Sequence, residues 1–281
     1  MISQEQKSVI TAILASGEVK ADEPLARHTT YGIGGPAELF VRPGNGSELV
    51  ALLQHADSEK IPLTILGSGS NCLVADSGIQ GIVISLAGTL NDLTMVGQQV
   101  TAGAGVMLGH MVHECAAAGL GGLDGLTGVP GTLGGALVMN AGAYGAEIST
   151  HLCEVRLVAF NGRQRTVPAA DLTFGYRTSG FKDNEIIIGG IFKFPRAQNG
   201  DLEKRREASQ KRKESQPLKQ RSAGSVFKNP DDGPAAGQLI DQAGLKGTGY
   251  GGAEISTHHA NFFINQGGAS ADDVAFLIKL A

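Results

Sequence analysis

The sequence predicts an α+β protein with more than one domain, and two observations lead to this fold class. First, short apolar runs bounded by Gly and Asp, typical of buried strands, alternate with longer amphipathic runs that are typical of helices. After a leading helix, the first part of the chain reads β-α-β-β, which is a small α+β layer. Second, the chain has 281 residues, 42% of them hydrophobic, which is enough for two or three domains.

The expected helices and strands follow from periodicity and from terminal signals. Helices are predicted at residues 3–16, 47–58, 106–118, 201–221, 235–243 and 270–281. Strand-like runs fall at residues 37–41, 63–66, 82–84, 94–102, 153–160, 165–167, 186–194 and 258–265. Pro217 and Gly244 are stop signals, and Ser270 with Asp273 predicts a capping box. The last helix reaches Ala281 without a cap, so we expect the chain to be cut short in mid-helix.

The composition excludes several functional classes. A net charge of −4 gives no general attraction to nucleic acid or to an anionic membrane. No apolar run approaches the roughly 18 residues of a membrane span, and residues 1–20 lack the pattern of a signal peptide. The cysteines Cys72, Cys115 and Cys153 are far apart and fit a reducing compartment. We therefore expect a soluble cytoplasmic protein, with a monomer favoured.

A metal site is not expected at the one segment that suggests it. The helix at residues 106–118 contains His110-Met-Val-His-Glu114, but a zincin needs the order HExxH. Because Leu108, Met111, Val112 and Cys115 form the opposite, apolar face, we expect the two histidines and the glutamate to form a solvated polar face.

One tight loop organises the chain. The apolar run Leu63–Leu66 is followed by Gly67-Ser-Gly-Ser-Asn71 and then by a second strand-like run, Ile82–Ile84. Glycine permits positive φ and lacks a Cβ, so backbone N–H groups can converge on an anion, and the two serines and the asparagine can add hydrogen bonds. We interpret this loop as a diphosphate cradle.

Other interpretations of the loop stay open at this point. No GxGxxG opens a helix here, so a Rossmann fingerprint is absent, and no Gly-Lys-Ser/Thr of a Walker A loop follows. Taken alone, the loop could equally be the glycine-rich tip of a surface hairpin.

A second glycine-rich stretch, Gly119–Gly145, favours the ligand interpretation. The chain contains 41 glycines, well above the usual share of about 7%, and no collagen period accounts for them. Main chain without Cβ atoms can lie against a flat, extended ligand and donate N–H groups along it. The alternative is a connector made of tight turns, although buried-type residues such as Leu133 and Leu137 recur within the stretch.

Two later segments carry charge. Arg177 stands in a turn among glycines and small hydroxyl residues, where its planar fork suits a carboxylate or a phosphate; a surface arginine is an equally open interpretation. The helix at residues 201–221 has a basic excess, but no aromatic residues are interleaved. We therefore favour a solvated helix over a nucleic-acid surface.

Several segments together resemble UDP-N-acetylenolpyruvoylglucosamine reductase, the MurB family, in its shorter type II form. The matching segments are HTTYGIGGPAE, ILGSGSNCLVADSGIQGIVI, GLTGVPGTLGGALVMNAGAYG, FGYRTSGF, QPLKQRSAGSVFKNP and HHANFFIN, which span residues 28–265. The resemblance implies a two-subdomain FAD-binding module of the vanillyl-alcohol-oxidase type and a smaller α+β substrate-binding domain. It places an N-terminal helix and arm at residues 1–27, the module at 28–196 with subdomains of about 28–90 and 91–196, and the substrate domain at 197–281.

The resemblance also implies an activity. Members reduce the enolpyruvyl group of a UDP-sugar with NADPH for peptidoglycan synthesis, hence for cell wall biogenesis, cell shape and cell division. The hydride passes from NADPH to non-covalently bound FAD and then to the enolpyruvyl C3, and C2 takes a proton. Arg177 matches the arginine of the family's YRxS segment, which stabilises the developing enolate. Ser225 matches the serine of the AGSxFKNP segment, which donates the proton. Asn229 matches the asparagine of the same segment, which would hold the substrate.

The remaining site residues are carried over in the same way. FAD is expected at Tyr31, Gly67, Ser68, Gly69, Ser70, Asn71, Gly128, Pro130, Gly131, Gly134, Gly135, Asn140, Gly142 and Ala143. Substrate is expected at Tyr176, Lys228, Asn229 and His259. The family's third catalytic group, a glutamate in an LEPEV-like segment near the C-terminus, has no counterpart, because Glu254 does not match it. Another flavin oxidoreductase of the same module, such as a sugar or alcohol oxidase, and a catalytically incomplete FAD-binding protein are the alternatives.

Overall fold

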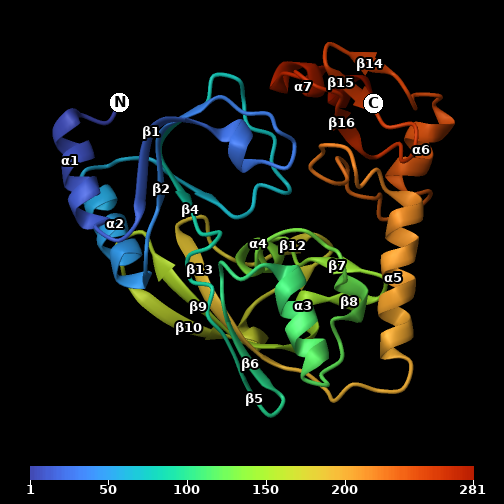
Figure 1. The fold of residues 1–281 in the computed structure, drawn as a ribbon, viewed down its shortest axis with the longest axis horizontal. Coiled ribbons are helices and arrows are strands. Elements are labelled where there is room, and N and C mark those ends of the chain that lie inside the picture. Colours follow the sequence, from blue (N-terminus) through green and yellow to red (C-terminus); the bar gives the residue numbers. More distant parts are fainter. The chain divides into compact units, whose positions relative to one another are not determined.

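The computed structural model describes residues 1–281 and contains seven α-helices (Figure 1). They are α1 (Gln4–Ile13), α2 (Gly46–Ser58), α3 (Leu108–Ala117), α4 (Leu133–Val138), α5 (Asp201–Ser215), α6 (Ala236–Gln242) and α7 (Ala271–Leu280). No helix combines the length and the apolar character that a membrane span requires.

The longer strands form two sheets. One has the order β1-β2-β4-β3, from β1 (Glu18–Pro24), β2 (Pro36–Arg42), β4 (Ile79–Ser85) and β3 (Leu63–Leu66). The other has the order β10-β9-β13-β6-β5, from β10 (Gln164–Pro168), β9 (Leu152–Ala159), β13 (Glu185–Lys193), β6 (Gln99–Gly103) and β5 (Leu93–Val96). Every pair in this second sheet is antiparallel.

Three smaller sheets complete the fold. Two are hairpins of two-residue strands, β7 (Gly142–Ala143) with β8 (Ala146–Glu147) and β11 (Phe174–Gly175) with β12 (Thr178–Ser179). The third joins β14 (Gly249–Tyr250), β15 (Ala253–Ile255) and β16 (Phe263–Asn265). Such short strands contain too few residues to show a period-two pattern in the sequence.

The chain forms two compact units that do not follow its linear order. The first unit comprises residues 1–21, 39–67 and 81–209, and the second comprises residues 22–38, 68–80 and 210–281. The domain limits expected from the sequence, near residues 27, 90 and 196, stay a prediction.

The first unit has two apolar cores. In one, α1 and α2 pack on the first sheet through side chains such as Ile10, Leu52 and Ile84. In the other, α3 and α4 pack on the second sheet. The face of α3 predicted to be apolar is the buried one, with Leu108, Met111, Val112 and Cys115 inside. His110 and Glu114 approach to 3.8 Å on its exposed side.

The second unit has one core, in which α7 packs on β14 and β15 and which contains Val274, Leu277 and Phe263. The predicted capping box is present, because Ser270 Oγ accepts from Asp273 N and the Asp273 carboxylate accepts from Ser270 N. Asp76 caps the same helix from the segment after the cradle loop, since its carboxylate accepts from Ala271 N at 2.9 Å and Asp272 N at 3.2 Å.

Three sequence predictions were wrong in extent. The strand expected at residues 94–102 is the hairpin β5–β6, which turns at Gly97 with φ +63°. The helix expected to reach residue 221 ends at Ser215, two residues before Pro217, because a proline disfavours the α conformation of the residue before it. The run at 258–265 is extended only from Phe263 onward.

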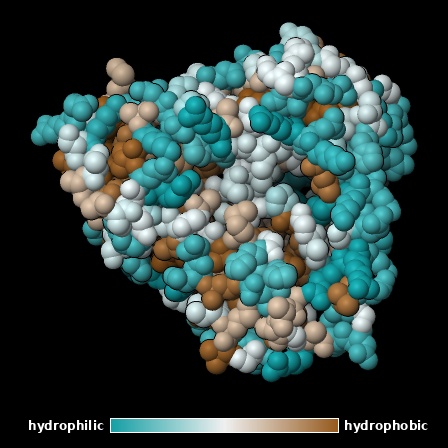
Figure 2. Space-filling model, viewed as in Figure 1, coloured by the Kyte–Doolittle hydropathy of each residue, from teal (hydrophilic) through white to brown (hydrophobic).

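Figure 2 shows hydrophilic residues along α5, at the right of the view.

Candidate active site

The predicted cradle loop is not a hairpin tip. It follows β3, and β3 pairs with β4 in parallel register, Leu63 opposite Ile82 and Leu66 opposite Ser85. Parallel neighbours need a crossover connection, whereas a hairpin joins antiparallel strands. The alternative of a surface hairpin is therefore excluded, and residues 67–78 form a looped crossover.

Close packing within the chain explains both glycines of this loop. A Cβ on Gly67 would lie 2.6 Å from Thr132 Oγ1, and a Cβ on Gly69 would lie 2.0 Å from the carbonyl oxygen of His28. Gly69 also has φ +63°, a conformation that favours glycine. The sequence interpretation assigned these glycines to ligand access. In the structure, the Thr132 side chain leaves no room for a Cβ at Gly67, and the His28 backbone leaves none at Gly69.

The loop nevertheless offers donors to a ligand. The backbone N–H groups of Ser68, Gly69 and Ser70 donate no hydrogen bond within the protein, although Gly69 is buried. The two serine hydroxyls lie 3.3 Å apart and are half-buried. Because buried N–H groups are nearly always paired in native proteins, this group of donors is suited to an anion.

A second loop of the same unit holds the cradle in place. Thr30 N donates to the Gly69 carbonyl at 3.0 Å, and Thr30 Oγ1 donates to the carbonyl of Ser222 at 2.7 Å. The next residue, Tyr31, is 2% exposed, and its hydroxyl has no hydrogen-bond partner. Burial raises the pKa of this phenol well above its usual value, so the hydroxyl stays protonated and can donate to an acceptor.

The second glycine-rich stretch surrounds α4 in the first unit. Thr132 accepts from Gly135 N and caps this helix, and a Cβ on Gly134 would lie 3.1 Å from that of Ala104. Gly128 and Gly131, expected at the cofactor with Pro130, have φ values of +78° and +131°. The stretch ends in the β7–β8 hairpin, which contains Gly142 and Ala143. It is thus a helix preceded by glycine turns and followed, after residues 139–141, by a hairpin.

Asn140 follows α4 and has an unsatisfied buried atom. It is 1% exposed and adopts φ +39°. Its Nδ2 donates to the Gly175 carbonyl at 3.0 Å and to Glu147 at 3.3 Å, whereas its Oδ1 has no partner. An acceptor left unpaired in this way is costly unless a ligand or water donates to it.

Arg177 lies next to this stretch in the β11–β12 hairpin. Its guanidinium donates to the carbonyl oxygens of Asn140 and Gly142, and it stacks 5.1 Å from the ring of Tyr176. Arg177 has φ +54°, which is strained for a non-glycine residue. The hairpin is also tied to α4 by Ser179 Oγ, which donates to the Val138 carbonyl at 2.6 Å. The two sequence segments are therefore one structural group.

Ser225 is held in the second unit by its neighbours. It is exposed and forms an antiparallel bridge with Phe262. Val226 N donates to the carbonyl of Asn261, and Asn261, which is 3% exposed, makes two side-chain bonds to the backbone of Phe227. The segment after the serine is therefore fixed by Asn261.

The remaining predicted substrate residues lie in the same unit. Lys228 is exposed, and Asn229 Oδ1 accepts from Ala236 N at the start of α6. His259 Nδ1 accepts from Asn261 N at 3.2 Å, so the neutral ring carries its proton on Nε2. Burial lowers the pKa of His259, with further contributions from Lys246 and His258.

The predicted site residues thus divide between the units. Gly67, the second glycine-rich stretch and Arg177 belong to the first unit, whereas Tyr31, residues 68–71, Ser225 and His259 belong to the second. Sequence reasoning missed Thr30, Thr132 and Asn261, which position these residues. Thr30 and Asn261 stand inside the segments HTTYGIGG and HHANFFIN, but their roles depend on partners far away in the sequence.

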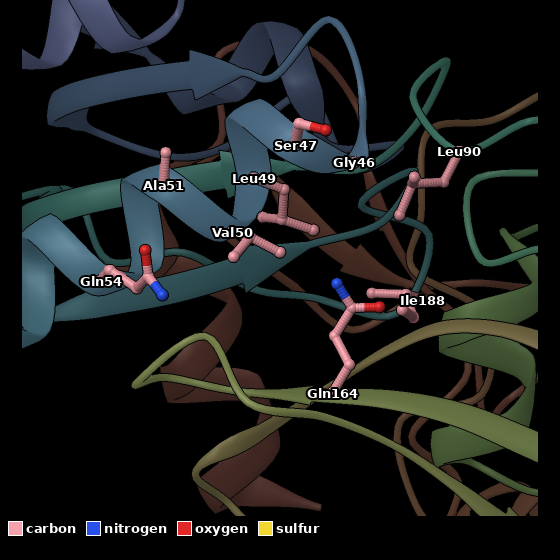
Figure 3. Close-up of a pocket in the computed structure, with 9 residues that line it drawn as sticks. All are labelled: Gly46, Ser47, Leu49, Val50, Ala51, Gln54, Leu90, Gln164 and Ile188. Carbon is pink, nitrogen blue, oxygen red and sulfur yellow. The ribbon is translucent and has the colours of Figure 1, made fainter.

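A cavity of about 510 Å³ lies elsewhere in the first unit (Figure 3). Its apolar side chains come from α2, from Leu90 and from Ile188, and Gln54 and Gln164 add amide groups. None of the predicted site residues lines it.

Comparisons with known proteins decide the family. A model of the FAD binding domain matches residues 37–167, and a model of the UDP-N-acetylenolpyruvoylglucosamine reductase C-terminal domain matches residues 216–281. The enzyme named UDP-N-acetylenolpyruvoylglucosamine reductase 2 of Symbiobacterium thermophilum is 40% identical over 93% of this chain and 85% of its own length. The chain belongs to the UDP-N-acetylenolpyruvoylglucosamine reductase family. The resemblance noted from the sequence motifs is therefore confirmed.

Solved structures agree with the family and with the fold class. The UDP-N-acetylenolpyruvylglucosamine reductase (MurB) of Thermus caldophilus superimposes with a TM-score of 0.83 and 36% identity over 94% of each chain. A Phl p 4 variant described as a glucose dehydrogenase reaches a TM-score of 0.50 over 66% of this chain at 13% identity, which shows a shared fold alone. The predicted fold, an FAD-binding module with a smaller α+β domain, is confirmed.

The residues present fit FAD. The unpaired N–H groups of residues 68–70 offer donors to a diphosphate, the buried Tyr31 hydroxyl offers one more, and Asn140 Oδ1 offers an acceptor within the second glycine-rich stretch. Flavin presents both donor and acceptor atoms, so these unsatisfied groups have the complementary chemistry.

Proposed function

We propose that this chain reduces the enolpyruvyl group of UDP-N-acetylglucosamine enolpyruvate to UDP-N-acetylmuramate, with FAD as cofactor and NADPH as reductant, in peptidoglycan precursor synthesis. Membership of the reductase family supports the reaction. Within the molecule, the observation that carries the proposal is the set of unpaired N–H groups at Ser68, Gly69 and Ser70, which suits the diphosphate of FAD.

The proposed cofactor residues come from two glycine-rich parts of the chain and from Tyr31. Residues 67–71 and Tyr31 would bind the diphosphate side, and the stretch from Gly128 to Ala143 would lie along the flavin. FAD supplies hydride transfer between NADPH and the substrate. The protein provides binding, orientation and electrostatics for that chemistry.

Arg177 would stabilise the negative charge that develops on the substrate carboxylate. Two of its N–H groups are used on the Asn140 and Gly142 carbonyls, which fixes the plane of the guanidinium. A guanidinium has five N–H donors, so others stay available for the substrate. Preorganised donors of this kind stabilise a transition state because they need no reorientation during the reaction. Its left-handed backbone is consistent with a functional constraint at this position.

Ser225 would deliver the proton to C2. A serine hydroxyl is a weak acid, so the transfer depends on the strongly basic enolate that receives the proton. Ser225 is exposed, while the segment after it is fixed by Asn261, which gives an accessible hydroxyl on a rigid support. Tyr176, Lys228, Asn229 and His259 would bind the substrate. We further propose that the protein works in the cytoplasm as a monomer, without nucleic-acid or membrane partners.

One experiment tests the proposal as a whole. The purified protein should show the visible spectrum of bound flavin and should oxidise NADPH only when the UDP-enolpyruvyl substrate is present. Oxygen-dependent turnover of an alcohol or a sugar would instead favour an oxidase. A flavin spectrum with no turnover of any of these substrates would indicate an FAD-binding protein without this activity.

A further inference from the structure

The cradle loop lacks a positive charge. Its donors, the N–H groups of residues 68–70 and the serine hydroxyls, are all neutral, and residues 67–80 contain neither lysine nor arginine. A diphosphate is anionic, and charge-assisted hydrogen bonds to phosphate are about twice as strong as neutral ones. A cation close to the loop would therefore contribute strongly to binding.

Arg221 lies beside the turn at Gly32, in the segment that is hydrogen-bonded to the cradle loop. Its guanidinium lies against the turn at Gly32: a Cβ on Gly32 would lie 2.5 Å from Arg221 Nη1 and 2.9 Å from its Cδ. Gly32 has φ +65°, so the turn both requires glycine and leaves room for the arginine side chain.

Thr30 connects this arginine to the cradle. The residue after Arg221, Ser222, accepts from Thr30 Oγ1, and Thr30 N donates to the carbonyl of Gly69 in the middle of the cradle. The Arg221 backbone is anchored separately, because its carbonyl accepts from Asn265 N at 2.9 Å. All of these residues belong to the second unit, so their arrangement is internal to one compact body.

The guanidinium of Arg221 has no anionic partner within the protein. It forms no ion pair and no side-chain hydrogen bond, and the residue is exposed. Other arginines are paired, such as Arg42 of β2 with Glu18 at 3.0 Å and Arg165 of β10 with Glu185 at 2.7 Å. An unpaired planar fork, in a segment that Thr30 joins to a loop with three unpaired N–H groups, is suited to phosphate binding.

We propose that Arg221 binds the diphosphate of the cofactor and supplies the positive charge that the cradle loop lacks. This inference rests on the proposed FAD site and adds a residue to it. The charge belongs to the segment that also contains Ser225.

The test compares a flavin with phosphates and one without. Apoprotein is titrated with FAD and with riboflavin, and binding is followed by flavin fluorescence, for the wild type, Arg221→Gln, Arg221→Lys and the control Lys219→Gln. Lys219 is exposed, lies two residues away and also forms no ion pair. The Arg221 side-chain substitutions leave its backbone bond to Asn265 in place.

Arg221→Gln should weaken FAD binding about 10- to 100-fold, the usual range for loss of a charge-assisted hydrogen bond, and should leave riboflavin binding unchanged. Arg221→Lys should recover part of the loss, and Lys219→Gln should bind both flavins as the wild type does. Equal FAD affinity in the wild type and Arg221→Gln would overturn the inference, as would equal losses for FAD and riboflavin. If the wild type binds no FAD, the proposed function itself fails.

Discussion

The side-chain amide of Asn261 forms a reciprocal pair of hydrogen bonds with the backbone of Phe227. Phe227 N donates to Asn261 Oδ1 at 2.9 Å, and Asn261 Nδ2 donates to the Phe227 carbonyl at 2.8 Å. An amide side chain that satisfies both backbone groups of one residue acts as a substitute strand neighbour. Because Phe227 is two residues after Ser225, this pair determines where the serine segment lies in the second unit.

Asn261→Ala should therefore loosen the serine segment. Both backbone groups of Phe227 lose a buried partner, which typically costs about 1–3 kcal/mol for each group that is left unsatisfied. Hydrogen–deuterium exchange should accelerate at residues 222–230. The control is Gln266→Ala, which removes an exposed bond to Glu254 and should change little. Unchanged protection of residues 222–230 in Asn261→Ala would contradict the supporting role of the amide.

Gly69→Val should abolish FAD retention, but for a steric reason within the protein. A Cβ at this position meets the His28 carbonyl and the Thr29 Cα, and valine is strongly disfavoured at φ +63°. The apoprotein should consequently be less stable than the wild type, which calorimetry can measure. Ser70→Ala is the matched control: it removes a ligand donor without a clash, so it should weaken FAD while the apoprotein keeps its melting temperature. A Gly69→Val apoprotein as stable as the wild type would refute the steric explanation.

Arg177→Lys should impair turnover far more than FAD binding. Lysine keeps the charge but cannot hold the two carbonyls of Asn140 and Gly142 in a planar fork. Loss of one preorganised donor typically costs about 3 kcal/mol, which is roughly a hundredfold or more in rate. Steady-state kinetics at saturating NADPH, together with flavin content, separate the two effects. A wild-type rate in this variant would remove Arg177 from the reaction.

Local signals predicted much of the fold, and long-range pairing accounts for what they missed. The apolar face of α3 and the capping box at Ser270 depend on residues within a few positions, so the sequence revealed both. Strand β1 was missed because it is an edge strand, EVKADEP, in which only Glu23 is buried. The turn inside residues 94–102 had a signal, Gly97, but the apolar pattern continued across it.

In the candidate site, too, local signals were predicted from the sequence and long-range contacts were not. Glycine spacing and polar residues indicated where the chain would contact a cofactor, and the family resemblance indicated Arg177 and Ser225. Neither could reveal that Gly67 faces Thr132, or that Thr30 bonds to Ser222, because these contacts join segments 65 or more positions apart. Positioning residues of this kind carry no chemical signature of their own, whereas reactive groups do.

Stability should decrease in mild acid, and His259 should contribute. Its pKa is lowered in the folded state by burial, whereas in the unfolded chain it titrates near its usual value of about 6.5. Between those two values the unfolded state binds more protons, so the free energy of unfolding falls as the pH falls below about 6.5. His259→Gln should flatten this dependence in urea titrations across that range. His151, whose pKa burial also lowers, should keep part of it. An identical pH dependence in the variant and the wild type would exclude the His259 contribution.

Ser225→Ala should separate the two halves of the reaction. Oxidation of NADPH by the bound flavin needs no proton at the substrate C2, so its rate should stay close to that of the wild type. Reoxidation of the flavin by the enolpyruvyl substrate needs that proton and should slow by roughly 10²–10⁴, the range for a positioned general acid. Ser225→Cys should restore part of the rate, because it keeps a transferable proton at a lower pKa.

The alternative is that Ser225 only stabilises a turn after Gly224, which has φ +80°. In that case both half-reactions would change together with the melting temperature. Stopped-flow absorbance at the flavin band, recorded separately for each half-reaction, distinguishes the two: equal slowing of both halves, or of neither, would rule out proton donation by Ser225.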